Sequence, residues 1–123
     1  MWEYYNPNPK AKNTGDCVVR ALSKALNIDW EKAKLLLDAY SMDEAEVETS
    51  DLVWGRILAE NGFSMKAVLC RNGCDLNGFC RSHPVGVYVV KLPNHAVCVV
   101  DGRFYDSFDS GREKPIYCWE ENA

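Results

Sequence analysis

Residues 95–109, HAVCVVDGRFYDSFD, decide how the second half of the chain folds. Two runs rich in Val, Tyr and Phe flank the pair Asp101-Gly102. An Asp-Gly pair between two such runs predicts a hairpin with a two-residue turn. A turn of that length fixes the pairing across the hairpin, which joins Val100 to Arg103, Val97 to Asp106 and His95 to Phe108.

In this register His95 and Asp106 point to the same face of the sheet as diagonal neighbours on adjacent strands. Diagonal neighbours lie about 7–8 Å apart, within reach of two such side chains. Asp109 falls on the opposite face, and Asp101 is used in the turn. Sheet geometry therefore selects Asp106 as the carboxylate that orients His95.

Other strand and helix patterns extend outward from this hairpin. Strand patterns occupy residues 63–69, 85–92 and 115–119. Before them, apolar residues recur at helical spacing in three segments, at residues 16–26, 29–40 and 50–60. Asp29 and Ser50 are N-cap candidates for the second and third helices. Helices followed by strands predict an α+β fold, with N-terminal helices packed on one side of a C-terminal antiparallel sheet.

The length of 123 residues fits a single domain, residues 1–123, in which residues 1–12 form an extended N-terminal arm. No segment approaches the ~18 consecutive apolar residues of a membrane span. The first ten residues, MWEYYNPNPK, have neither the basic nor the apolar region of a signal peptide. The net charge is −4 and the basic residues are dispersed, which argues against nucleic-acid binding. We therefore expect a cytoplasmic protein with no membrane and no nucleic-acid partner.

Residues 13–22, NTGDCVVRAL, place Cys17 where the first helical pattern begins. A thiol at a helix N-terminus has a lowered pKa, and the thiolate is the nucleophilic form. By itself this position also suits a small core residue. Together with His95 and Asp106, Cys17 completes a candidate triad of nucleophile, base and orienting acid.

The chain order of Cys17, His95 and Asp106 resembles that of the papain-like cysteine peptidases. The similarity lies in GDCVVRAL (15–22), PVGVYVVKL (84–92) and NHAVCVVDGRFYDS (94–107). The strands that carry His95 and Asp106, both within the last stretch, look most like the bacteriocin-processing (double-glycine leader) peptidases, and the first stretch also resembles the cysteine motif of ovarian-tumour deubiquitinases. The resemblance implies a minimal papain-like fold and a cysteine protease that hydrolyses an amide or isopeptide bond. A peptide or protein substrate and no cofactor are then expected.

The chain departs from this family at the oxyanion hole. Papain-like enzymes commonly place a Gln several residues before the cysteine, and this chain has no Gln. Asn13 could take its place, with the Cys17 backbone N–H as the second donor. Asn13 equally suits an ordinary loop asparagine that bonds within its own turn.

A metal site is the main alternative. Cys70, Cys74, Cys80 and His83 offer four possible zinc ligands within 14 residues. The protein would then be a non-catalytic or zinc-stabilised interaction module on a papain-like scaffold. A Cys74–Cys80 disulfide or simple packing could also explain these residues, although we expect the six thiols to be reduced.

Overall fold

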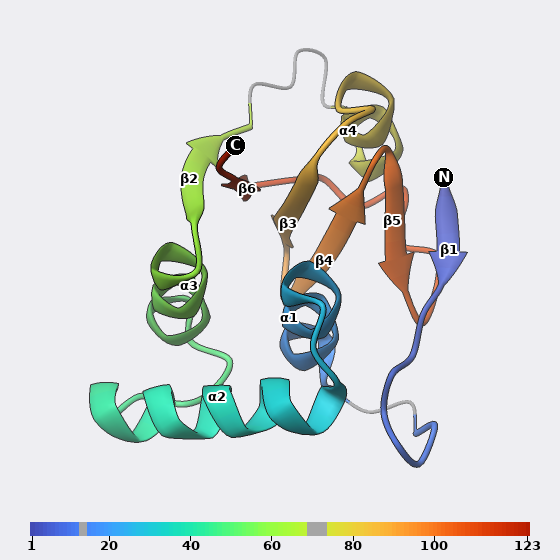
Figure 1. Ribbon diagram of the computed structural model, residues 1–123. Coiled ribbons are helices and arrows are strands. Elements are labelled where there is room, and N and C mark those ends of the chain that lie inside the picture. The colour runs from blue at the N-terminus through green and yellow to red at the C-terminus, as the bar shows by residue number, and fades with distance from the viewer. Residues whose placement is uncertain (13–14, 69–73) are drawn as a thin grey trace.

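The structure is a computed structural model that describes residues 1–12, 15–68 and 74–123. Within these residues the chain forms four helices and a six-stranded sheet (Figure 1). In chain order the elements are β1 (Trp2–Tyr4), α1 (Cys17–Leu26), α2 (Trp30–Glu44), α3 (Asp51–Glu60), β2 (Phe63–Ala67), α4 (Leu76–Ser82), β3 (Val87–Leu92), β4 (His95–Val100), β5 (Arg103–Asp106) and β6 (Tyr117–Glu121). The α+β class predicted from the sequence is confirmed.

The three predicted helices are present, and local capping explains where they begin and end. Asn27 takes a left-handed conformation after α1, and its backbone N–H bonds to carbonyls of the last turn. The Asp29 carboxylate accepts from the Lys32 backbone N–H at 2.7 Å and begins α2. Ser50 caps α3 in the same way. Helix α2 continues past its predicted end at residue 40.

The hairpin of β4 and β5 has the predicted register, with Val100 opposite Arg103 and Cys98 opposite Tyr105. Asp101 and Gly102 both have positive φ, 49° and 79°. Two central residues with positive φ give the turn a twist that matches the right-handed twist of the strands. The conformation of Asp101 and Gly102 is therefore the physical cause of the register between β4 and β5.

The sheet has the order β1-β5-β4-β3-β6-β2. The expectation of a purely antiparallel sheet is wrong, because β1 pairs in parallel with β5. The first residues of the arm form this edge strand rather than only packing on the surface. The Trp2 indole and the Tyr5 backbone N–H both donate to the Asp106 carbonyl, at 3.0 and 2.9 Å. The strand is short and pairs with the edge of β5 through backbone groups. It therefore shows no hydrophobic pattern from which the sequence could predict it.

Helices cover both faces of the sheet, which corrects the expectation that they lie on one side. Residues of α1, α2 and α3 share a core with Val89 of β3. Helix α4 packs on the opposite face, where Phe79 meets Tyr88 and Val90 of β3. The sequence patterns predicted no helix between the strand segments 63–69 and 85–92, because α4 is only seven residues long. Its cap is the Asp75 carboxylate, which accepts from the Gly78 N–H at 2.9 Å.

Candidate active site

Cys17 is the first residue of α1, the helix that packs across β4 (Figure 1). Its side chain is partly buried at the edge of the core. The thiol lines the same cavity as the His95 ring and Ala96, and the interactions of both with the sulfur lower its pKa. The start of the helix therefore meets the start of β4 at the cysteine.

His95 lies between Cys17 and Asp106. Its Nε2 atom is 2.6 Å from Oδ2 of Asp106, so Nδ1 is the ring nitrogen left for the Cys17 thiol. The ring of Phe108 lies against the imidazole, with centroids 5.1 Å apart. The contact between His95 Nε2 and Asp106 Oδ2 confirms the prediction that these two side chains face each other across the hairpin.

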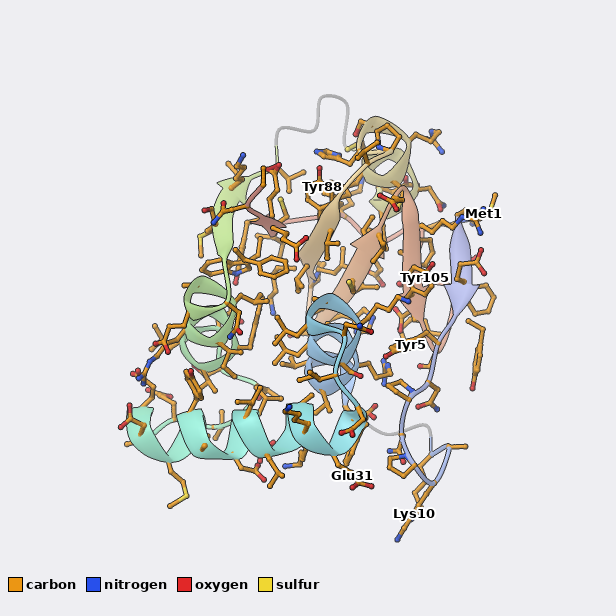
Figure 2. The ribbon with its side chains drawn as sticks, in the orientation of Figure 1. Met1, Tyr5, Lys10, Glu31, Tyr88 and Tyr105 are labelled. Carbon is orange, nitrogen blue, oxygen red and sulfur yellow. The ribbon has the colours of Figure 1, made fainter. Side chains whose placement is uncertain are left out.

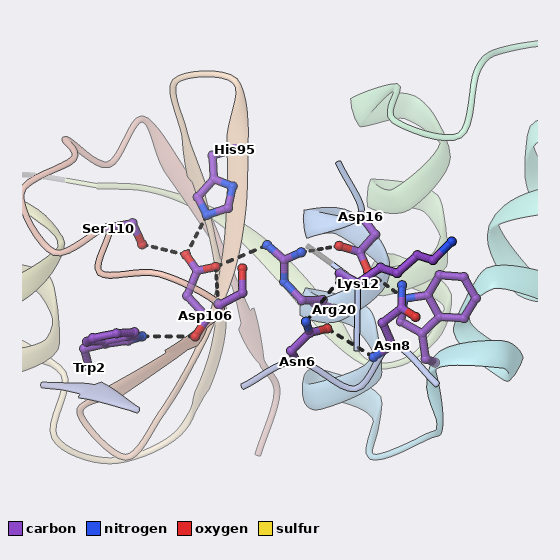
Figure 3. Close-up of polar contacts among 11 residues, drawn as sticks. Trp2, Asn6, Asn8, Lys12, Asp16, Arg20, His95, Asp106 and Ser110 are labelled. Carbon is purple, nitrogen blue, oxygen red and sulfur yellow. Dashed lines mark hydrogen bonds and ion pairs between the residues drawn. The ribbon is translucent and has the colours of Figure 1, made fainter. Parts of the chain in front are cut away.

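The Asp106 carboxylate accepts four hydrogen bonds from the residues that the structure describes (Figure 3). Its side chain is 1% exposed. Oδ2 accepts from His95 and from the Ser110 hydroxyl at 2.7 Å. Oδ1 accepts from the Ser107 backbone N–H at 2.8 Å and from Arg20 Nη2 at 3.2 Å. These donors hold the carboxylate in one orientation toward the imidazole.

Arg20 is a site residue that the sequence did not single out. Its side chain is 4% exposed and forms ion pairs with both Asp16 and Asp106. Oδ2 of Asp16 also accepts from the Trp30 indole at 2.8 Å. The buried guanidinium thus joins the helix that carries Cys17 to the strand that carries Asp106. The available signal was one charged residue in the otherwise apolar run CVVRAL.

The charges around the thiol favour its ionised form. Burial raises the pKa of Cys17, but other effects outweigh it. The hydrogen bond and charge of His95, the Ala96 backbone and the charge of Arg20 together leave this pKa below its ordinary value. By contrast, burial raises the pKa of Cys80, and it raises that of Cys118 to about 11. Cys17 therefore differs from these core thiols in its tendency to ionise.

The interaction between His95 and Asp106 raises the pKa of the imidazole and lowers the pKa of the carboxylate. Burial lowers the pKa of His95, but the hydrogen bonds and charges of Asp106 and Cys17 raise it to about 9. Burial raises the pKa of Asp106, but His95, Ser110 and the Ser107 N–H bring it below the ordinary value. The lowered pKa of Cys17 and the raised pKa of His95 both favour transfer of the thiol proton to the imidazole, beside an ionised Asp106.

Two cavities open onto this group. One of about 360 Å³ and one of about 320 Å³ both include Cys17, His95 and Asn94 in their walls. Phe108 lines the first, and Thr49 and Trp54 line the second. A small molecule can therefore approach both the sulfur and the imidazole.

The other predicted site residues are placed as follows. Asn13 and Cys70 lie outside the described residues. Cys74 is disulfide-bonded, so the expectation that every thiol is reduced is wrong at this position. Cys80 is free, so it forms no disulfide with Cys74, and it is 2% exposed. His83 stacks on Phe79, and its Nδ1 lies 2.8 Å from the Phe79 carbonyl.

The three described positions, Cys74, Cys80 and His83, do not form the expected zinc site. Cys74 is held in a disulfide and Cys80 is buried, so the two do not both offer a thiolate to a metal ion. Across residues 1–12, 15–68 and 74–123, no three His, Cys, Asp or Glu side chains are grouped as a metal site would require.

No family model matches the chain, and comparisons with curated proteins and with solved structures find no similar protein. Among the described residues, no helix has the length and apolar character needed to cross a bilayer.

Proposed function

We propose that the protein is a cysteine-dependent hydrolase, a cysteine protease that cleaves an amide or isopeptide bond in a peptide or protein. One observation carries the proposal. His95 bonds through Nε2 to the buried Asp106 carboxylate, and its ring shares the walls of two cavities with the Cys17 thiol at the start of α1. A base that is oriented by an acid and contacts a nucleophile is the arrangement that acyl transfer requires.

In this mechanism His95 Nδ1 takes the proton of the Cys17 thiol. The thiolate attacks the carbonyl carbon of the substrate and forms a tetrahedral oxyanion. As the C–N bond breaks, His95 returns the proton to the leaving nitrogen, which departs as an amine and leaves a thioester. A water molecule then gives a proton to His95 and attacks the thioester. The acid is released, and the thiol is restored.

Donors at the start of α1 would stabilise the oxyanion. Backbone N–H groups of the first helical turn point out of the helix N-terminus and carry partial positive charge. The Cys17 N–H belongs to this turn. Asn13 stays the side-chain candidate that the sequence suggests.

The resemblance to papain-like peptidases also supports the proposal. The order of Cys17, His95 and Asp106 is that of the superfamily, and helices on a sheet are compatible with its fold. A minimal papain-like domain, acting in the cytoplasm without a cofactor, is the reading we propose.

Mapping of cysteine reactivity tests the function. The intact protein is treated with a limiting amount of iodoacetamide across pH 5–10, and the alkylated cysteine is identified by mass spectrometry. We expect label on Cys17, with a rate that rises at a lower pH than for an ordinary thiol because its pKa is lowered.

Two variants control this test. Cys17→Ala should abolish the fast labelling. Cys118→Ala should retain it, because Cys118 is buried and its pKa is raised. Preferential labelling of Cys80 or Cys118 in the wild-type protein would contradict the proposal.

A further inference from the structure

The turn between β3 and β4 consists of Pro93 and Asn94, because Leu92 and His95 form the last pair of the hairpin. In Figure 2 Tyr88 marks the beginning of β3, where its ring contacts α4, and the strand runs from there toward α1. The turn therefore lies at the end of these strands that is far from α4, next to the histidine of the candidate site.

Asn94 belongs to both cavities that open onto this site. Among the residues that the structure describes, the cavities of about 360 and 320 Å³ have four wall residues in common, namely Gly15, Cys17, Asn94 and His95. A substrate that spans the two cavities has its scissile bond at these shared walls, between the nucleophile and the base. Glycine has no side chain, so Asn94 is the shared residue whose side chain has no assigned role.

The conformation of the turn does not by itself require an asparagine. Asn94 has a φ of 52°, and the ring of Pro93 holds its own φ at a negative value. A proline followed by a residue with positive φ is typical of a type II turn, in which glycine suits the second central position best. Glycine would therefore form this turn at least as well, and the side chain at position 94 is available for another role.

The Asn94 amide is free to bind a substrate. Within residues 1–12, 15–68 and 74–123, no backbone or side-chain group forms a hydrogen bond with this amide. The residue is exposed, and its NH₂ group offers two donors. Such a donor can bond to a substrate oxygen without first losing a hydrogen bond within the protein.

The oxyanion of acyl transfer is the substrate atom that this donor suits. When the Cys17 thiolate attacks the carbonyl carbon, the carbonyl oxygen becomes negatively charged beside the sulfur. His95 exchanges protons with the thiol and with the leaving nitrogen, so its ring is not directed at that oxygen. Of the side chains on the shared walls, Asn94 is therefore the one left to donate to the oxyanion.

We propose that Asn94 is a catalytic residue whose side-chain amide donates a hydrogen bond to the oxyanion, together with the Cys17 backbone N–H. The inference rests on the proposed hydrolase function and adds a donor from the β3–β4 turn to those at the start of α1. No covalent bond of Asn94 changes. The amide stabilises the tetrahedral intermediate and releases the oxygen when the C–N bond breaks and the carbonyl forms again.

Two small reagents with different chemistry test the proposal. p-Nitrophenyl acetate acetylates a thiolate through a tetrahedral oxyanion, whereas iodoacetamide alkylates it by direct displacement of iodide, without an oxyanion. Both rates are measured for the wild type and for Asn94→Gly, which keeps the positive φ. Acetylation of Cys17, read from the burst of p-nitrophenolate that Cys17→Ala lacks, should slow by roughly 10²-fold in Asn94→Gly. The iodoacetamide rate should stay within about twofold, because displacement needs only the thiolate.

Two further glycine variants are the controls. Asn27→Gly makes the same change at another asparagine with positive φ, 54°, which lines neither cavity, and it should alter neither rate. Asn13→Gly removes the side-chain donor that the sequence suggests. Slower acetylation in Asn13→Gly with none in Asn94→Gly would overturn the assignment, and so would an equal slowing in Asn27→Gly and Asn94→Gly.

The two reagents also separate this inference from the proposed function. Slow alkylation of wild-type Cys17 by iodoacetamide contradicts the hydrolase function itself. Fast alkylation with the same acetylation rate in the wild type and in Asn94→Gly contradicts the role of Asn94 alone. An equal fall of both rates in Asn94→Gly also contradicts that role, since it shows that the variant disturbs the thiolate rather than the oxyanion.

Discussion

Replacing Asp106 by asparagine should lower the pKa of His95 strongly. The imidazole titrates near pH 9 although it is largely buried, and an ordinary histidine titrates near 6.5. Each pKa unit corresponds to about 1.4 kcal/mol, so the surroundings favour the imidazolium by about 3 kcal/mol after the opposing effect of burial. Asp106 makes the larger of the two hydrogen-bond contributions that raise this pKa.

Because a carboxylate stabilises the positive imidazolium, its removal must move the pKa downward. The asparagine can still accept the Nε2 hydrogen bond, but it carries no charge, and burial continues to oppose protonation. The pKa of His95 should therefore fall to about 7 or below, a loss of about 2–3 kcal/mol of imidazolium stabilisation.

The assay is an NMR titration of the His95 ring carbons from pH 5 to 10. Asp109→Asn is the matched control, since Asp109 is three residues further on, is exposed, and bonds to the Gly111 N–H rather than to His95. A His95 pKa that stays near 9 in Asp106→Asn would refute the reasoning, as would an equal fall in Asp109→Asn.

Three stability predictions can be checked by urea unfolding. Arg20→Met leaves the Asp16 and Asp106 carboxylates buried and should lower the unfolding free energy by about 3–5 kcal/mol. Arg56→Met, at a solvent-accessible cluster of ion pairs, should lower the unfolding free energy much less, and equal losses would contradict the argument. Ser110→Ala removes a buried donor to Asp106 and should lower the unfolding free energy by about 1–3 kcal/mol, so unchanged stability would speak against that hydrogen bond. Gly102→Ala puts a side chain at φ +79°, with Cβ 3.2 Å from the Cys80 carbonyl oxygen, and should lower the unfolding free energy by about 1–2 kcal/mol. A loss under about 0.5 kcal/mol would show that the left-handed backbone at this turn does not require glycine.

The parts of the fold that the sequence predicted depend on local physical signals. The Asp-Gly pair needs two positive φ angles and determines the register of β4 against β5. That register is a property of a few neighbouring residues, so it could be worked out without knowing the rest of the molecule. The three long helices were predictable for the same reason, since their apolar spacing and caps are local.

The features that were missed depend on distant contacts. The pairing of β1 with β5 joins residues about a hundred positions apart, and it uses backbone groups that every sequence has. Helix α4 is too short to show a period, and its stability comes from Leu76 and Phe79 packing on the far face of the sheet.

The same division applies to the site. The contact between His95 and Asp106 follows from one hairpin. The position of Cys17 beside His95 instead requires α1 to pack at one particular position along β4. Nothing in residues 13–22 determines that packing by itself. Cys17 was therefore a candidate from its helix position and chain order, and its neighbours became known only from the tertiary structure.

The ion pairs of Arg20 explain what fixes the position of α1 along the sheet. Asp16, Cys17 and Arg20 are spaced so that they lie on one face of the first turns of α1. The guanidinium bonds to Asp16 within the same turn and to Asp106 on β5, where the carboxylate also holds His95. If α1 moved along the sheet by a few ångströms, the cation would lose Asp106 while still buried, at a cost of several kcal/mol. One helical turn thus carries the proposed nucleophile together with the cation that ties it to the orienting acid. The spacing between Cys17 and His95 therefore depends on a buried ion pair rather than on a surface loop.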